Sequence, residues 1–177
     1  MAHEPQTRQV RAVPLTREAF APFGDVIEHA GPGRRRHLDV PFEHGAMATR
    51  PAMWVSRAGQ ACALPCRLQN MERHPHSAQS FIPLSGAPYL VVVAPEARDG
   101  TPDLGRLQAF VAAGSQGVCY RPGVWHHGLS VLQAPAEFAV VMTLTGTGED
   151  DEFWPMPRPV DILPPEAACA PEPCHAP

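Results

Sequence analysis

Short apolar runs, each bounded by proline, glycine or charged residues, recur along most of the chain. Runs of about four to eight residues that are rich in β-branched and aromatic side chains are typical of β-strands, whereas an amphipathic helix needs apolar positions every three to four residues over a longer stretch. The pattern predicts strands over residues 8–14, 25–28, 53–57, 67–74, 79–83, 89–94, 107–112, 118–121, 124–132 and 137–144.

One short helix is predicted near the N-terminus. Thr16 is a residue type that caps helices, Glu18 lies near the positive end of the helix dipole, and Gly24 ends the segment. We therefore expect one or two helical turns through residue 21, and a further single turn over residues 104–107. Because the 22 prolines disfavour long helices, the fold class is predicted to be all-β, a barrel or a sandwich.

The chain is expected to form a single domain over residues 1–163. Its 177 residues are enough to bury a hydrophobic core. From residue 164 onwards the sequence is rich in proline, has few large apolar residues and shows no periodicity, so residues 164–177 are predicted to be a disordered tail. The N-terminus has no signal-peptide pattern, and the longest apolar run, residues 89–95, is too short to span a bilayer. We expect a cytoplasmic protein with no membrane contact.

The charged residues exclude several function classes. A net charge of -4 and a pI near 6.1 argue against a nucleic-acid-binding surface. All 14 basic residues are arginine, which excludes Schiff-base chemistry, pyridoxal phosphate attachment and the lysine of phosphate-binding loops. The five cysteines are odd in number and lack paired C-x-x-C motifs, so a disulfide framework is not expected. With these classes excluded, the expected binding partner of this protein is a small molecule.

A histidine pair follows a predicted turn in the second half of the chain. Pro122 and Gly123 favour a tight turn, and an apolar run begins just after it. Since side chains alternate along a strand, His126 and His127 must point to opposite faces, so one of them points inward whatever the register. An inward histidine beside a turn is well placed for metal ligation or proton transfer. The alternative is a structural histidine pair beside Trp125.

A second group of polar residues lies at the end of an earlier predicted strand. Glu72, His74 and His76 occur at every second position and would share one face of an extended chain, although Pro75 interrupts it. Gln79 then begins the next apolar run. Oxygen and imidazole ligands of this kind, facing a histidine from a distant strand, suit one divalent ion. The alternative is a polar hairpin on the surface.

Together the two segments resemble the metal motifs of cupins. Those motifs have His-x-His, a Glu about five residues later and a Gly beyond it, followed on a later strand by Pro-Gly-x-x-His. In this chain Glu72 and His74, then Gln79 and Gly86, stand in the first motif, and residues 122–126 provide the second, ending in His126. The resemblance implies a cupin-like double-stranded β-helix, or jelly-roll barrel. It also implies metal ligands Glu72, His74, Gln79 and His126, a weaker set than three histidines and a carboxylate.

More closely, the chain is similar to the ureidoglycolate lyase family. The similarity runs in order over about residues 10–150, and its most specific pieces are Glu-Arg-His-Pro at 72–75 and Trp-His-His at 125–127. The other matching pieces are residues 14–27, 79–83, 91–95, 102–104, 109–110 and 116–118.

The resemblance implies cleavage of ureidoglycolate to glyoxylate and urea, a step of allantoin and purine catabolism. It also implies catalytic roles for His126, His74 and Glu72, and substrate binding by Gln79, Arg121 and Tyr120. The expected cofactor is one divalent ion, Ni, Mn or Zn, although a metal-free site stays open. A homodimer is expected, because cupin barrels often pair.

Two segments depart from the family pattern. Residues 38–45 read Leu-Asp-Val-Pro-Phe-Glu-His-Gly where the family usually has Asn-x-Gly, and residues 141–144 read Val-Met-Thr-Leu where it usually has an Asp-Arg pair. The missing arginine would be a natural anchor for a substrate carboxylate. The alternative function is therefore a diverged cupin, either an enzyme or a binding protein, for another small hydroxy- or keto-acid. Without the missing arginine, binding of the ureidoglycolate carboxylate would fall to Arg73, Arg121, residues 34–36 or a metal ion. Arg121 and residues 34–36 rank above Arg73, which alternation points away from Glu72 and His74.

Overall fold

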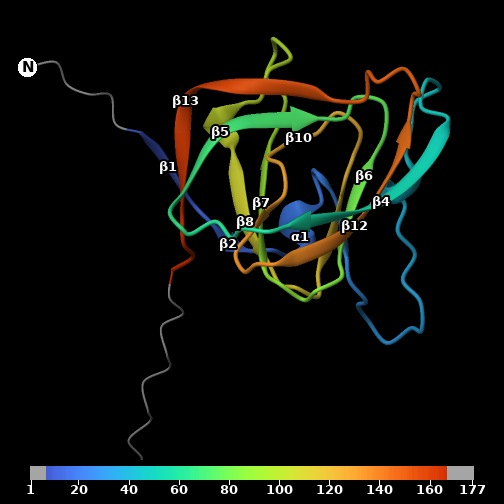
Figure 1. Ribbon diagram of the computed structural model, residues 1–177, viewed down its shortest axis with the longest axis horizontal. Coiled ribbons are helices and arrows are strands. Elements are labelled where there is room, and N and C mark those ends of the chain that lie inside the picture. The colour runs from blue at the N-terminus through green and yellow to red at the C-terminus, as the bar shows by residue number, and fades with distance from the viewer. Residues whose placement is uncertain (1–6, 167–177) are drawn as a thin grey trace, which may run out of the picture.

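Two β-sheets make up almost all of the computed structural model, which describes residues 7–166 (Figure 1). The larger has the strand order β1-β13-β5-β10-β7-β8-β2, with β11 also paired to β7, and the smaller has the order β3-β9-β6-β12-β4. The elements are β1 (Arg8–Arg11), β2 (Val13–Pro14), α1 (Arg17–Phe20), β3 (Gly24–Ile27), η1 (Val40–Phe42), β4 (Arg50–Ala58), β5 (Cys66–Arg73), β6 (Gln79–Pro83), β7 (Tyr89–Ala94), η2 (Leu104–Arg106), β8 (Gln108–Ala112), β9 (Gly117–Tyr120), β10 (Trp125–His126), β11 (Ser130–Val131), β12 (Ala136–Leu144) and β13 (Glu152–Leu163).

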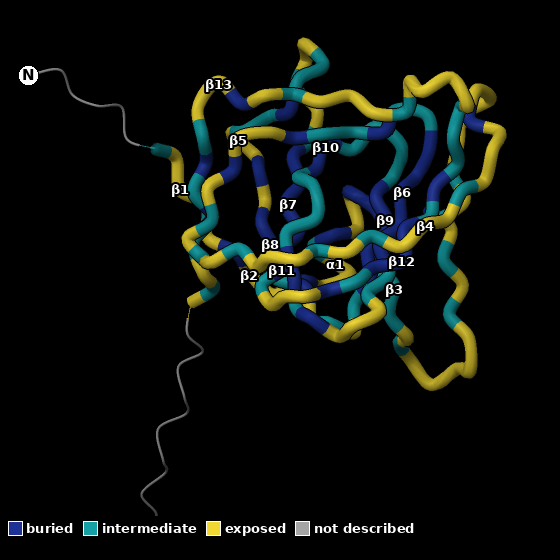
Figure 2. The backbone as a smooth tube through the Cα atoms, in the orientation of Figure 1, coloured by how far each residue is buried: buried dark blue, intermediate teal, exposed yellow. Residues whose placement is uncertain are grey.

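The sheets curve toward each other and enclose the main core. Every residue of β7 is buried, as the dark blue tube in Figure 2 shows. Val91 and Val93 pack into the inner cluster with Phe138, whereas Leu90 and Val92 pack into a second cluster on the other face of the sheet. Because both faces of β7 are covered, its sequence is a continuous apolar run rather than an alternating one.

The predicted all-β barrel with one short helix is confirmed. The predicted strands 79–83 and 89–94 coincide with β6 and β7, and the predicted turn at 104–107 corresponds to η2. Thr16 caps α1 as expected, since its hydroxyl oxygen accepts a hydrogen bond from Ala19 N at 3.2 Å. The cupin-like architecture inferred from the motifs agrees with this arrangement.

The longest strand was not predicted. β13 contains three prolines, which would usually argue against a strand because proline cannot donate a ladder hydrogen bond. Its pairing with β5 is interrupted between Pro155 and Val160, and the other two prolines lie in that interval. On its other side β13 pairs with β1 in parallel. The apolar side chains of Met156, Val160 and Ile162 cover the second cluster, and their burial stabilises the strand despite the prolines.

Two predicted strands are interrupted. Residues 8–14 form β1 and β2 on either side of Ala12, which donates a hydrogen bond to Leu163 O. The prediction of one strand over residues 124–132 is also wrong, because residues 127–129 leave the ladder between β10 and β11. Residues 164–166 have no regular secondary structure, and the rest of the predicted tail lies outside the described residues. Within residues 7–166 no helix is long and apolar enough to cross a membrane.

Candidate active site

Three residues predicted from the two motifs meet inside the barrel. Glu72 lies near the end of β5, His74 follows that strand, and His126 ends β10. The antiparallel pairing of β10 with β5 places His126 opposite Glu72. One ligand atom from each of the three residues lies within 4.8 Å of the others. Strand pairing has therefore joined two segments that are about fifty residues apart in the sequence.

The His126 ring is held in one orientation and one tautomer. Its Nδ1 atom lies 2.9 Å from the Val124 carbonyl oxygen. A carbonyl can only accept, so Nδ1 carries the proton and Nε2 carries a free lone pair. The ring stacks on Tyr120 with a centroid distance of 4.1 Å and an interplanar angle of 12°. Burial, reinforced by nearby His74, lowers the pKa of His126 to about 3, so the imidazole is neutral near pH 7.

His74 is oriented by a residue that the sequence did not single out. Its Nδ1 lies 2.7 Å from Asp151 Oδ1 and 3.3 Å from the Asp150 carbonyl oxygen. Asp150 in turn accepts a hydrogen bond from Thr145 N at 2.7 Å, which holds this segment in place. The Nδ1 proton of His74 thus points at oxygen, and its Nε2 points into the site. The only sequence signal for Asp151 was the acidic run at residues 149–152.

The carboxyl group of Glu72 has a raised pKa. Burial is the main cause, the neighbouring His74 opposes it, and the Asp151 carboxylate adds to it. Glu72 Oε1 lies 3.6 Å from His126 Nε2, which is longer than a hydrogen bond. A raised pKa stabilises the protonated form of the carboxyl group, which is the form that can donate a proton.

The buried polar atoms around this cluster fit a divalent metal ion. Gln79 opens β6 and donates a hydrogen bond through Nε2 to the Met142 sulfur at 3.8 Å. Its Oε1, together with Nε2 of His74 and Nε2 of His126, is buried without a hydrogen-bond partner among the described residues. Such orphaned polar atoms are costly unless a bound partner such as a cation satisfies them. Two imidazole nitrogens with carboxylate and amide oxygens are ligands suited to Ni, Mn or Zn.

A cavity of about 320 Å³ opens onto the cluster. Besides Glu72, His74 and Gln79, its walls include Trp54, Met142, Leu144, Asp150 and Asp151. No arginine is among the described residues that line it. The cavity is therefore acidic, and a negatively charged ligand needs a cation to enter it.

Arg121, predicted to bind substrate, is not brought to this cavity. Its Nη1 donates a hydrogen bond to Glu43 Oε1 at 3.0 Å, and its side chain lines a different cavity together with Arg36. Tyr120, the last residue of β9, stacks on His126, whereas the Arg121 side chain just beyond the strand is 41% exposed. Arg36, which belongs to the predicted anchor at residues 34–36, also lines that different cavity. There its guanidinium donates hydrogen bonds to the backbone oxygens of Val26 and Glu28.

Trp125, His127 and His76 are not part of the cluster formed by Glu72, His74 and His126. Trp125 is buried in the second apolar cluster, and its Nε1 donates a hydrogen bond to Gly100 O at 3.1 Å. His127 points away from His126, as alternation predicted, and contacts Asn70 and Ser130. His76 is not part of the group of candidate metal ligands.

Comparison with known proteins places these residues in a family. The family model described as "Ureidoglycolate lyase" matches residues 7–162. The chain belongs to the ureidoglycolate lyase family. A protein named ureidoglycolate lyase from Brucella melitensis biotype 2 is 43% identical over 145 residues, 77% of this chain and 83% of the relative. A ureidoglycolate lyase from Pseudomonas aeruginosa (strain LESB58) is 38% identical over 156 residues, 83% of this chain and 91% of the relative.

Of the two segments that depart from the usual pattern of the ureidoglycolate lyase family, one lies at the cavity. Residues 38–45 surround η1, whereas residues 141–144 form the end of β12. Met142 and Leu144 line the cavity beside Gln79. This chain therefore has two apolar side chains in the cavity wall, at the segment where the resemblance led us to expect an Asp-Arg pair.

Proposed function

We propose that this protein is a lyase that cleaves ureidoglycolate to glyoxylate and urea. The observation that carries the proposal is that Nε2 of His74 and Nε2 of His126 converge on the carboxyl group of Glu72, whose pKa is raised. Ureidoglycolate has a hydroxyl, a carboxylate and a urea nitrogen on one carbon. Its cleavage needs a base at the hydroxyl and an acid at the nitrogen, and the site offers one group of each kind.

In the site without a metal ion, His126 and Glu72 divide the two proton transfers. The neutral His126 accepts the hydroxyl proton at Nε2 as the C=O bond forms and the C–N bond breaks, and Glu72 gives its proton to the departing urea nitrogen. Products and protons balance, because the proton on His126 then returns to Glu72, whose Oε1 lies 3.6 Å from Nε2. The stack with Tyr120 and the Nδ1 bond to Val124 O keep Nε2 aimed at the reacting carbon throughout.

The acidic cavity supports the presence of a metal ion in the working enzyme. His74, His126 and Glu72 would hold it, with Gln79 Oε1 as a further ligand. When bound there, a divalent ion would supply positive charge for the substrate carboxylate and the developing oxyanion, leaving the proton transfers to Glu72. Arg121 remains the other predicted carboxylate anchor. An unchanged KM in Arg121→Ala would rule it out.

The decisive experiment measures urea and glyoxylate release from racemic ureidoglycolate. We expect release above the spontaneous rate with the wild type, a loss of at least about 100-fold with His126→Gln, and no change with the control His29→Gln, which alters an exposed histidine. Loss on chelation, with recovery on adding one of Ni²⁺, Mn²⁺ or Zn²⁺, would support the metal. A folded wild type without any release would refute the lyase proposal.

A second candidate function rests on the cavity wall. Met142 and Leu144 provide apolar contacts, and an acid with an alkyl or aryl group would bury more surface against them than ureidoglycolate does. A diverged cupin enzyme or binding protein for another small hydroxy- or keto-acid is therefore the alternative. Thermal-shift screening of such acids against ureidoglycolate separates the two candidates.

We also propose a homodimer formed through β4. This strand lies at the edge of the smaller sheet and, within the described residues, pairs only with β12. Met53 and Val55 are exposed on it, at 68% and 59%. A long, apolar edge strand is a template for pairing with a second copy. Sedimentation velocity should show a dimer for the wild type and for the control Leu84→Lys, and a monomer for Val55→Lys. A monomeric wild type would refute the proposal.

A further inference from the structure

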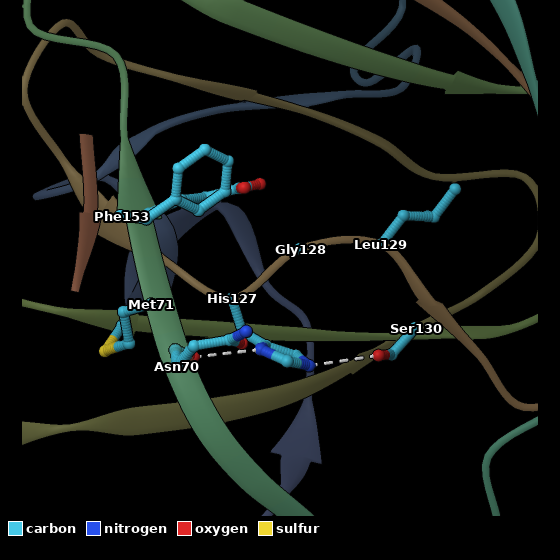
Figure 3. A pocket seen from close by; sticks show the side chains of 8 residues that line it. Asn70, Met71, His127, Gly128, Leu129, Ser130 and Phe153 are labelled. Carbon is cyan, nitrogen blue, oxygen red and sulfur yellow. Dashed lines mark hydrogen bonds between the residues drawn. The ribbon is translucent and has the colours of Figure 1, made fainter. Parts of the chain in front are cut away.

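A second cavity, of about 310 Å³, is drawn in Figure 3. Glu72 also borders this cavity. Glu72 is the one lining residue that the two cavities share. The other walls of the second cavity include Asn70, His127, Gly128, Ser130 and Phe153. The candidate active-site carboxyl group is therefore open to two separate spaces, and the proposed function so far uses only one of them.

The second cavity exists because β10 is short. β10 meets β5 at one register position, His126 opposite Glu72, and the chain then leaves the ladder. The His127 side chain spans the resulting opening, with Nδ1 at 3.2 Å from Asn70 O and Nε2 at 3.2 Å from Ser130 Oγ, as the dashed lines in Figure 3 show. Side-chain bonds thus replace the missing backbone bonds and hold the walls of the cavity in place.

These bonds decide which hydrogen-bonding groups face the cavity. The carbonyl oxygen of Asn70 can only accept, so Nδ1 of His127 is the protonated nitrogen and Nε2 accepts from the Ser130 hydroxyl. The Ser130 oxygen then has its lone pairs left to accept from a ligand. The protonated Glu72 carboxyl group can also accept, through its carbonyl oxygen. No described residue that lines this cavity is an arginine.

The shape of the cavity beside Glu72 depends on Gly128. A Cβ atom at this position would lie 3.4 Å from Glu72 Oε1, so the missing side chain leaves space directly against the carboxyl group. Phe153, which is 67% exposed, and Leu129 provide apolar walls (Figure 3). Acceptors on one side and an aromatic ring on the other suit a small, flat, neutral group that carries several N–H donors, and they disfavour a carboxylate.

We propose that this second cavity is the subsite for the ureido group, whose N–H groups donate to Glu72 and to Ser130 Oγ. The inference rests on the proposed lyase function. It places the reacting carbon beside Glu72, with the carboxylate and hydroxyl on the His74 and His126 side. The urea nitrogen then lies next to the carboxyl group that protonates it, and free urea occupies the second cavity after cleavage.

Product inhibition tests the subsite. Ser130→Ala removes one hydrogen bond to the ureido group, so we expect KM for ureidoglycolate and Ki for urea both to rise about 3- to 10-fold, with kcat changed less. Ki for glyoxylate should stay the same, because glyoxylate occupies the other cavity. Gly128→Ala should have the same selective effect by filling space. The control is Ser115→Ala, an exposed serine, which should change none of these constants.

A binding measurement separates this inference from the proposed reaction. Saturation-transfer NMR with N-methylurea, whose methyl protons are observed directly, should show binding to the wild type and at least a threefold weaker signal with Ser130→Ala. Binding of this kind without any lyase activity would support the subsite while refuting the reaction. A different result would overturn the subsite alone. In that result the enzyme has lyase activity, but Ki for urea and the binding of N-methylurea are the same in the wild type, Ser130→Ala and Gly128→Ala.

Discussion

Asp151 Oδ1 lies 2.7 Å from His74 Nδ1 and joins the segment before β13 to the end of β5. The contact orients the His74 ring so that its buried Nε2 is directed at Glu72 and His126. Carboxylates that hold the far nitrogen of a catalytic or ligating histidine in this way fix its tautomer and its orientation. Asp151 therefore acts through His74 as a positioning residue, although it lies far from His74 in the sequence.

Replacing Asp151 should reduce activity through His74. We expect Asp151→Ala to lower kcat/KM about 10- to 100-fold, and Asp151→Asn to lower it less, because an amide oxygen still accepts from Nδ1. The matched control is Glu149→Gln, which removes an exposed carboxylate from the same segment. Equal activities for Asp151→Ala and the control would show that the contact does not orient His74.

Gln79→Glu should have opposite effects with and without metal. The new carboxylate would be buried beside Glu72, so without metal it should lower the melting temperature. With a divalent ion bound it supplies a charged ligand, and the rise in melting temperature on adding metal should exceed that of the wild type. Scanning calorimetry with chelator and with Ni²⁺ measures both, with the exposed Gln108→Glu as control. A rise no larger than the wild type's would exclude Gln79 as a metal ligand.

Stability should fall on acidification because His126 is buried as the neutral form. The pKa of His126 is about 3 in the folded protein, whereas the ordinary pKa of a histidine is 6.5. Between these values the unfolded chain binds a proton that the folded chain does not, so the free energy of unfolding decreases as pH drops from 6.5 toward 3. Guanidinium titrations in chelator should show a smaller decrease for His126→Gln. In an independent measurement, the NMR chemical shifts of the His126 ring should not change between pH 8 and pH 5. A titration of these shifts with a midpoint near pH 6.5 would contradict the buried, neutral state of His126.

Arg73 should contribute to stability more than a typical surface arginine. Its guanidinium donates to Glu152 at 2.6 Å and to Glu96 at 2.7 Å, and it lies 4.5 Å from the centre of the Trp125 ring. Arg73→Ala should lower the free energy of unfolding by about 1–2 kcal/mol. Arg67→Ala, which removes a longer and more exposed ion pair on the same strand, should cost less than about 0.5 kcal/mol. Guanidinium unfolding measures both variants. Equal decreases in the free energy of unfolding for Arg73→Ala and Arg67→Ala would show that the contacts of Arg73 add no stability.

Local patterns in the sequence determined the class of fold and the centre of the site. β6 and β7 matched their predicted bounds because turn residues flank apolar runs, and the Thr16 cap marked α1. Alternation along the strand after Pro122 separated His126 from His127, and the period-two spacing put Glu72 and His74 on one face. Each of these conclusions depends on residues only a few positions apart, which the backbone geometry relates directly.

The tertiary structure decided everything that depends on which distant strands lie side by side. It placed Asp151 against His74, took Arg121 to a different cavity, and opened the space beside Ser130 where β10 ends. It also made a strand of the proline-rich segment β13, because burial against β5 outweighed the lost hydrogen bonds. Strand pairing and burial minimise the free energy of the whole chain, so a segment's own sequence specifies its periodicity but not its neighbours.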